Sequence, residues 1–111
     1  MTRDPRIAVS MARLHPDKIA LYERIHDEMT AEHAADVRTA YRRIDVYRLG
    51  DLLIMLTEQN AGPLPVPTAA EEARDRAWHA SLAECFPEPW RPADPIFSLA
   101  VAGSEHSRRF G

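Results

Sequence analysis

The sequence predicts an α+β fold in which two helices cover one face of a four-stranded antiparallel sheet. Three observations lead to this prediction. Apolar and small or polar residues alternate along short stretches, apolar residues recur at helical spacing along two longer stretches, and a helix-capping signal opens the second of these longer stretches. In chain order the patterns indicate strand, helix, strand, strand, helix, strand. This is the order of ferredoxin-like folds, with expected elements at residues 7–14, 16–39, 42–48, 52–56, 69–86 and 95–102.

The first strand and helix meet at a proline. Residues 7–14 alternate larger apolar side chains with small ones, as strands do. His15 is steered away from the helical conformation by Pro16, which itself suits the first position of a helix. No glycine or further proline follows until about Thr39, so we expect one helix, or two joined by a kink near Thr30. Its apolar side carries a stripe with steps of three and four residues: Tyr22, Ile25, Met29, His33 and Val37.

A β-hairpin is expected next. Residues 42–48 alternate, with Ile44 and Val46 on one face, and residues 49–51 supply a turn that contains glycine. The continuous apolar run at 52–56 is typical of a central strand covered on both faces, although a short buried helical turn would show the same run.

The second helix follows a loop. Residues 58–67 hold three prolines and a glycine, which favours a surface connection. Thr68 and Glu71 match the capping box, so a helix should run from about Ala69 to Phe86. One of its faces carries Trp78, Leu82 and Cys85.

Two further predictions concern Arg74, on the same face of the second helix, and the end of the chain. Arg74 lies one turn before Trp78, so its stem should cover the indole while its guanidinium reaches water. Residues 90–94 should be irregular, 95–102 the last strand, and 103–111 a polar tail. We expect a single domain over residues 1–111 with its core at about 6–102.

Composition limits the possible partners. A net charge of −3 and a pI near 5.9 provide no basic surface for nucleic acid or an acidic membrane. No apolar run is long enough to span a bilayer, no signal peptide opens the chain, and Cys85 is the only cysteine. A cytoplasmic protein is expected. The all-apolar run at 52–56 also predicts a homodimer that packs sheet against sheet.

Tyr22 and His26 are the first candidates for chemistry. They are i and i+4 neighbours on the inward side of the first helix, so they form either a hydrogen-bonded core pair or part of a pocket. Imidazole takes up and releases protons near neutral pH, and a phenol can donate or relay one. His26 and His33 are seven residues apart with no metal-binding motif, so no metal site is expected. Cys85 has the setting of a buried small apolar residue.

In the order and spacing of these segments the chain resembles the L-rhamnose mutarotases, a family of small dimeric α/β-barrel proteins. The resemblance spans residues 6–102. It covers a first strand ending near Met11, the turn at Pro16 and Asp17, the segment from Tyr22 to Asp27, the hairpin at 49–54, and the helix from Arg76 to Pro87. The chain differs from the family in having Glu28, Met29 and Thr30 after the histidine and a single tryptophan in the second helix, which bears on the choice of sugar.

The resemblance implies an aldose mutarotase that interconverts the α and β anomers of a deoxyhexose such as L-rhamnose without a cofactor. His26 and Tyr22 would be the catalytic proton-transfer pair, Trp78 would be a platform for the sugar, and His33 would contact the substrate in the same pocket. His79 is expected at the surface. Two alternatives stay open: a cofactor-free monooxygenase on the same dimeric barrel, and a non-catalytic ligand-binding module.

Overall fold

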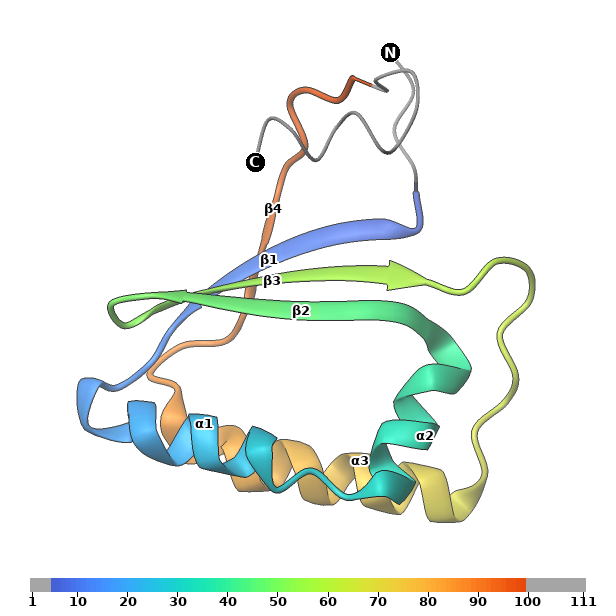
Figure 1. The fold of residues 1–111 in the computed structure, drawn as a ribbon, viewed down its shortest axis with the longest axis horizontal. Helices are drawn as coiled ribbons and strands as arrows, with labels where there is room; N and C mark the ends of the chain where they lie inside the picture. Colours follow the sequence, from blue (N-terminus) through green and yellow to red (C-terminus); the bar gives the residue numbers. More distant parts are fainter. Residues whose placement is uncertain (1–4, 100–111) are drawn as a thin grey trace.

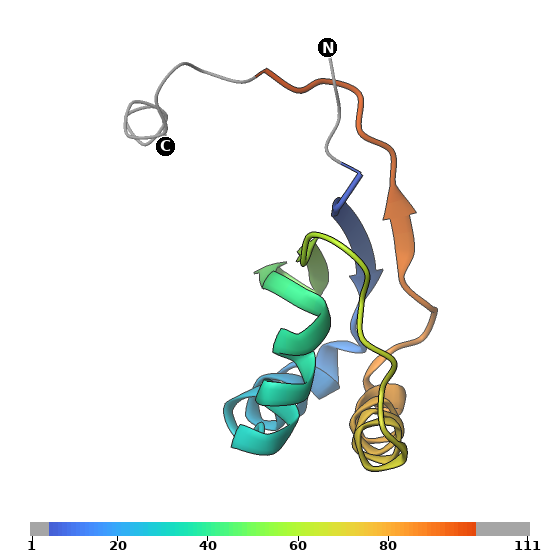
Figure 2. The same ribbon diagram turned by 90° about the vertical axis from the view of Figure 1, so that its right-hand side faces the viewer.

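The computed structural model describes residues 5–99 and has two layers, a sheet and a layer of helices (Figure 1). The sheet has four antiparallel strands in the order β2-β3-β1-β4. Both views place all the α-helices on one side of it (Figures 1 and 2). The α+β, ferredoxin-like prediction is confirmed. The elements in chain order are β1 (Ile7–Arg13), η1 (Pro16–Lys18), α1 (Ile19–Asp27), α2 (Ala31–Ala40), β2 (Tyr41–Leu49), β3 (Leu52–Gln59), α3 (Ala69–Leu82), η2 (Ala83–Cys85) and β4 (Arg91–Ala93).

The predicted first helix is two helices. A single 3₁₀ turn, η1, begins at Pro16 as expected, and α1 continues to Asp27. The chain then leaves the helical conformation, and Thr30 caps α2 by accepting a hydrogen bond from the backbone N–H of His33 over 3.1 Å. This cap is the physical reason for the break near Thr30.

The hairpin forms where the sequence predicts it, and β3 is one of the two central strands. Gly50 has a φ of 62°, a conformation that favours glycine at this turn. Ile54 lies between Met11 of β1 and Tyr47 of β2. Strand β3 extends to Gln59, beyond the predicted 52–56, because β1 and β2 pair with it along its length.

The prediction for the last strand is wrong. Strand β4 comprises Arg91–Ala93, which was expected to be irregular, and residues 95–99 form no strand. An edge strand tolerates proline because one of its sides has no neighbour, so Pro92 can lie opposite Ser10. The remainder of the predicted strand, 100–102, and the predicted tail, 103–111, lie outside the described residues.

The core lies between the helices and one face of the sheet. Leu14, Leu53 and Cys85 are fully buried, and Tyr22 and Leu82 complete the cluster. Helix α3 starts with the predicted capping box: Thr68 Oγ1 accepts from the N–H of Glu71, whose carboxylate accepts from the N–H of Thr68. It ends at Leu82, a few residues before the predicted Phe86, and η2 follows. Within residues 5–99, no helix is long and apolar enough to cross a bilayer.

The opposite face of the sheet is uncovered by the described residues and carries apolar side chains at its centre, with the Arg43–Asp45 ion pair toward one end of β2. Side chains alternate along each strand, so β3 points Leu53 to the helices and its neighbour Ile54 to the other side. Met11 and Tyr47, the partners of Ile54, are 36% and 57% exposed.

Candidate functional site

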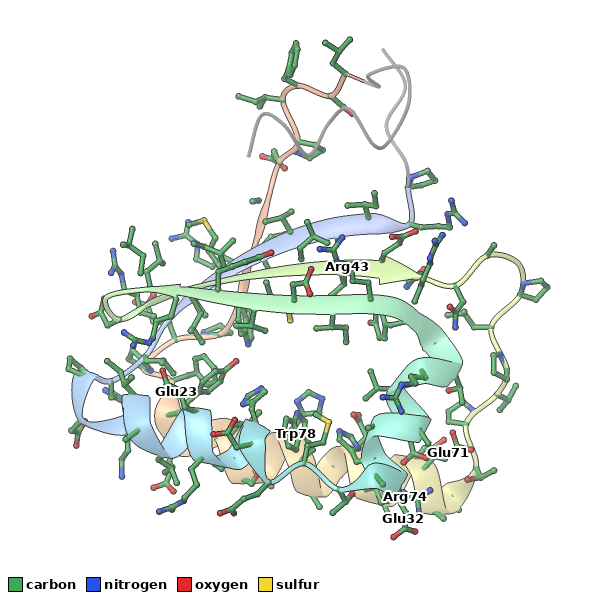
Figure 3. The ribbon with its side chains drawn as sticks, viewed as in Figure 1. Glu23, Glu32, Arg43, Glu71, Arg74 and Trp78 are labelled. Atoms are coloured by element: carbon green, nitrogen blue, oxygen red, sulfur yellow. The ribbon has the colours of Figure 1, made fainter. Side chains whose placement is uncertain are left out.

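A cavity of about 1150 Å³ separates the helical layer from the sheet. Helices α1, α2 and α3 provide Tyr22, Trp78 and the imidazoles, and β2 and β3 provide a floor of apolar side chains together with polar ones that include Arg42 and Arg48. Figure 3 shows Trp78 in the helical layer, on the side that faces the sheet. The structure therefore brings together all four residues singled out in the sequence, namely Tyr22, His26, His33 and Trp78. They share the cavity with two floor residues that the sequence did not single out, Val46 and Met55.

Tyr22 and His26 are in direct contact on α1. Their ring centroids are 4.3 Å apart, with the planes tilted by 41°. Nδ1 of His26 lies 2.9 Å from the backbone carbonyl oxygen of Tyr22. A carbonyl oxygen only accepts, so Nδ1 carries the proton and donates it. In the neutral ring, Nε2 of His26 is therefore left with a lone pair, which can accept a proton from a ligand.

Tyr22 is a buried residue of the site. It is 5% exposed, and the edge of Phe86 meets its ring at a centroid distance of 5.7 Å. Burial raises the pKa of the Tyr22 phenol to about 12, and the neighbouring Cys85 thiol contributes to the shift. The hydroxyl therefore keeps its proton at neutral pH and is suited to donate a hydrogen bond.

Trp78 contacts both histidines. The ring centroid of His26 is 4.9 Å from that of Trp78 in an edge-on arrangement, and that of His33 is 5.0 Å away with planes tilted by 32°. The two imidazoles come from different helices, because the Thr30 cap redirects the chain between α1 and α2.

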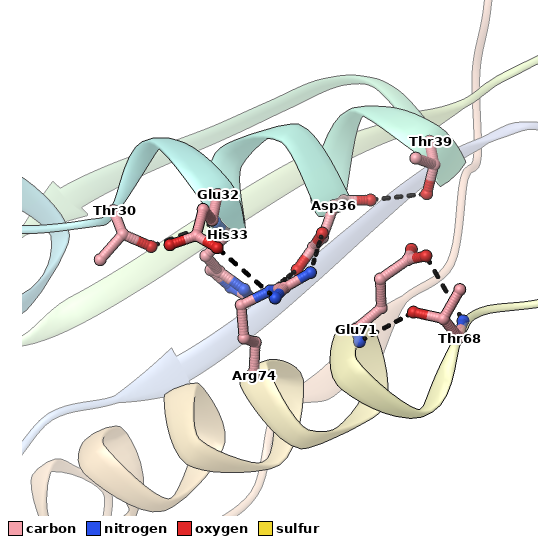
Figure 4. Close-up of polar contacts among 8 residues, drawn as sticks. All are labelled: Thr30, Glu32, His33, Asp36, Thr39, Thr68, Glu71 and Arg74. Atoms are coloured by element: carbon pink, nitrogen blue, oxygen red, sulfur yellow. Dashed lines mark hydrogen bonds and ion pairs between the residues drawn. The ribbon is translucent and has the colours of Figure 1, made fainter.

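An ion-pair network joins α2 to α3 beside the cavity. Arg74 donates to both carboxylate oxygens of Asp36, over 2.6 Å and 3.0 Å, and Glu32 lies 3.7 Å from the guanidinium (Figure 4). The Arg74 side chain is 34% exposed, so its guanidinium reaches water as predicted, but it also binds the Asp36 carboxylate, which is 16% exposed and which the sequence did not identify as its partner. The Arg74 guanidinium holds the pKa of Asp36 below its usual range. The sequence signal, two acidic residues four apart on one helix, was present but did not identify the partner.

Two other residues that the sequence analysis considered are His79 and Cys85. His79 is exposed, as expected, with Nε2 3.4 Å from a carboxylate oxygen of Asp75 at the rim of the cavity. Cys85 is fully buried, and burial raises the pKa of its thiol. No group of three or more His, Cys, Asp or Glu side chains in residues 5–99 is arranged to hold a metal ion.

Solved structures with the same fold include proteins of different chemistry. The structure superimposes on an L-rhamnose mutarotase from Formosa agariphila with a TM-score of 0.67 and 11% identity, over 85% of this chain and 98% of the other. A putative antibiotic biosynthesis monooxygenase from Nitrosomonas europaea matches with a TM-score of 0.51 and 13% identity, over 78% and 92% of the two chains. At these identities the similarity establishes the fold alone.

Sequence comparison is more specific. An L-fucose mutarotase of Xanthomonas campestris pv. campestris is 35% identical to this chain. The aligned region covers 82% of this chain and 86% of the relative. A model of the L-rhamnose mutarotase family matches residues 6–99, which include every element described above. The chain belongs to the L-rhamnose mutarotase family and is an enzyme of the carbohydrate epimerase type.

Proposed function

We propose that this enzyme interconverts the α and β anomers of a free deoxyhexose such as L-rhamnose or L-fucose. The observation that carries the proposal is the orientation of His26. Its Nδ1–H is held by the Tyr22 carbonyl, which leaves Nε2 free to act on a ligand in a cavity lined by Trp78. The 35% identity to an L-fucose mutarotase supports the substrate class.

Anomer exchange needs proton transfer at two oxygens of the sugar. The anomeric hydroxyl loses its proton, the bond from the anomeric carbon to the ring oxygen breaks, and the ring oxygen gains a proton; ring closure on the other carbonyl face reverses these steps. His26 can accept the first proton at Nε2, and Tyr22 can donate or relay through its hydroxyl. General acid–base catalysis of this kind contributes about 10²–10⁴-fold to the rate.

Two further residues would hold the sugar. Trp78 offers an aromatic surface on which the C–H side of a sugar ring can pack, and His33 lines the cavity beside it. The floor of Val46 and Met55 supplies apolar contact of the kind that a methyl group of a deoxyhexose can use. These contacts set the position of the anomeric carbon relative to His26.

We also propose that the enzyme is a homodimer and acts in the cytoplasm. The uncovered sheet face around Ile54 would pack against its copy, and apolar residues that follow β4 would add to the contact, since Ile96, Phe97 and Leu99 are 92%, 71% and 69% exposed. Both views show the segment that carries these three residues extending away from the helices (Figures 1 and 2). The buried free thiol of Cys85 suits a reducing compartment.

Exchange NMR on the anomeric protons tests the catalytic proposal. L-rhamnose, L-fucose and several other aldoses would be measured with and without the purified protein. We expect faster exchange for at least one deoxyhexose and its loss in His26→Ala, with the folded state checked by circular dichroism. Full activity in His26→Ala would remove His26 from its proposed role, and no acceleration of any sugar would contradict the proposed function itself.

A further inference from the structure

His33 has an unusual environment among the rings of the cavity. It is 5% exposed, and its Nδ1 is buried without a hydrogen-bond partner. Buried polar atoms in native proteins nearly always have a partner, so an unpaired nitrogen calls for a physical explanation. His33 also lines the cavity, and because Nδ1 is its buried nitrogen, we infer that Nε2 is the one that a ligand can reach.

The charged neighbours of His33 explain why Nδ1 has no partner. Asp36 lies on the same helix close enough to interact electrostatically with His33, but both of its carboxylate oxygens accept hydrogen bonds from Arg74 of α3. Glu32 is turned toward the same guanidinium. The acidic groups around His33 are therefore engaged by Arg74, and His33 is held by its ring contact with Trp78 and by the Thr30 cap on its backbone N–H.

The unpaired Nδ1 determines the tautomer of the neutral ring. A buried N–H without an acceptor is especially rare in proteins, so the proton belongs on Nε2. His33 then presents a donor to the cavity, whereas His26 presents an acceptor, because its own Nδ1–H is bonded to the Tyr22 carbonyl. The two rings contact Trp78 at nearly equal distances, 4.9 Å and 5.0 Å. A donor and an acceptor thus stand beside the same indole.

We propose that His33 is a catalytic residue whose Nε2–H donates a hydrogen bond to the ring oxygen of the sugar while Nε2 of His26 takes the proton of the anomeric hydroxyl. The inference rests on the proposed anomer exchange and adds a group to it. As the bond from the anomeric carbon to the ring oxygen breaks, the anomeric C–O bond becomes a carbonyl and negative charge develops on the ring oxygen. The proton held by His26 then passes to that oxygen, directly or through Tyr22.

In this step His33 keeps its own proton. It stabilises developing charge, as preorganised donors do in other active sites, and no additional reactant is required. Removal of one such donor typically costs about 10²–10³-fold in rate. The effect should fall on the turnover number more than on KM, because the hydrogen bond strengthens only as charge develops.

The test compares two variants on two sugars. His33→Leu removes the donor, and His33→Gln keeps an N–H at similar reach. Exchange rates at saturating sugar and KM would be measured by anomeric NMR for the preferred deoxyhexose and for its analogue with sulfur in place of the ring oxygen, since sulfur accepts hydrogen bonds weakly. We expect about a 10²-fold loss in His33→Leu with the oxygen sugar, substantial recovery in His33→Gln, and little difference between wild type and His33→Leu with the sulfur sugar.

Other outcomes would overturn this role. An active wild type whose rate survives in His33→Leu, a change in KM alone, or an equal loss on the sulfur sugar would each reject the ring-oxygen contact. A wild type that accelerates no sugar would instead reject the proposed function, and this role with it. His15→Gln, a histidine that does not line the cavity, is the matched control and should keep the wild-type rate. Thermal unfolding of each variant separates loss of function from loss of fold.

Discussion

Arg74 of α3 holds Asp36 of α2 through two hydrogen bonds, 2.6 Å and 3.0 Å long, and this is the main polar connection between the two helices that carry Trp78 and His33 (Figure 4). Arg74→Met should therefore lower the thermal midpoint by several degrees and increase the mobility of the α2–α3 contact, because Asp36 would be left partly buried without its partner. Differential scanning calorimetry measures the first effect and amide hydrogen exchange the second.

Arg76→Met is the matched control for that change. Arg76 lies on the same helix, and its only described ion pair, with Glu72, is 4.0 Å long and exposed. Exposed pairs of this kind contribute little to stability, so the thermal midpoint should stay near that of the wild type. Equal shifts in the two variants would show that the connection to Asp36 has no special stabilising effect.

The same pair predicts how stability depends on acid. Arg74 lowers the pKa of Asp36 in the folded protein, so the unfolded state binds the proton more readily. The resulting stabilisation is present above the unfolded pKa, about 3.9, and is lost as pH falls through the lower folded pKa. Urea unfolding should show wild type more stable than Asp36→Asn at pH 7, with the gap closing as the pH falls through the lowered folded pKa. A gap that stays constant over this range would contradict the assignment.

Local features of the fold and site could be predicted from the sequence, and contacts distant in sequence could not. The proximity of Tyr22 to His26 follows from a spacing of four on a helix, and the capping box at Thr68 from a spacing of three. The Arg74–Asp36 pair joins residues 38 apart, so it depends on how two helices pack. Strand β4 likewise depends on its pairing with β1, which outweighs the poor strand propensity of a segment with Pro92 at its centre.

The phenol of Tyr22 should ionise at a higher pH than an ordinary tyrosine. Burial raises the pKa of its phenol to about 12, so the neutral ring stabilises the fold below the unfolded pKa of about 10, and this contribution is lost as pH rises from 10 to 12. An absorbance titration of the phenolate should show one late component that is absent in Tyr22→Phe. Tyr47→Phe, at an exposed position, is the control and should leave this late component in place. A late component retained in Tyr22→Phe would contradict the burial argument.

Replacing Tyr22 also tests its part in proton transfer. Tyr22→Phe keeps the contacts with His26 and Phe86 and removes only the hydroxyl. If the hydroxyl donates or relays a proton, the exchange rate should fall at least tenfold, at the lower end of the usual contribution of general acid–base groups, about 10²–10⁴-fold. Unchanged exchange in a variant of normal stability would limit Tyr22 to holding the imidazole of His26 in place.

The proposed platform predicts a loss of affinity when the indole is removed. Trp78→Leu should weaken sugar binding by up to about tenfold, because an aromatic contact contributes roughly 0.5–1.5 kcal/mol beyond the area that it buries. Trp78→Phe retains an aromatic face and should show an intermediate loss. Sugar titrations followed by chemical-shift changes measure both variants. An affinity equal to wild type in Trp78→Leu would mean that the sugar binds elsewhere in the cavity.

The uncovered face of the sheet predicts that a charge at its centre prevents dimer formation. Ile54 lies on a central strand, paired with Met11 and Tyr47. In a two-fold interface the substituted residue of both subunits would be buried. Ile54→Glu should raise the dissociation constant of the dimer by at least about 10²-fold, since burying an unpaired carboxylate is costly. Sedimentation velocity over a concentration series measures the change. Val66→Glu, at an 88% exposed apolar position outside the sheet, is the matched control and should sediment as the wild type does. A dimer that persists in Ile54→Glu at low concentration would place the interface on another surface, and a monomeric wild type would reject the homodimer altogether.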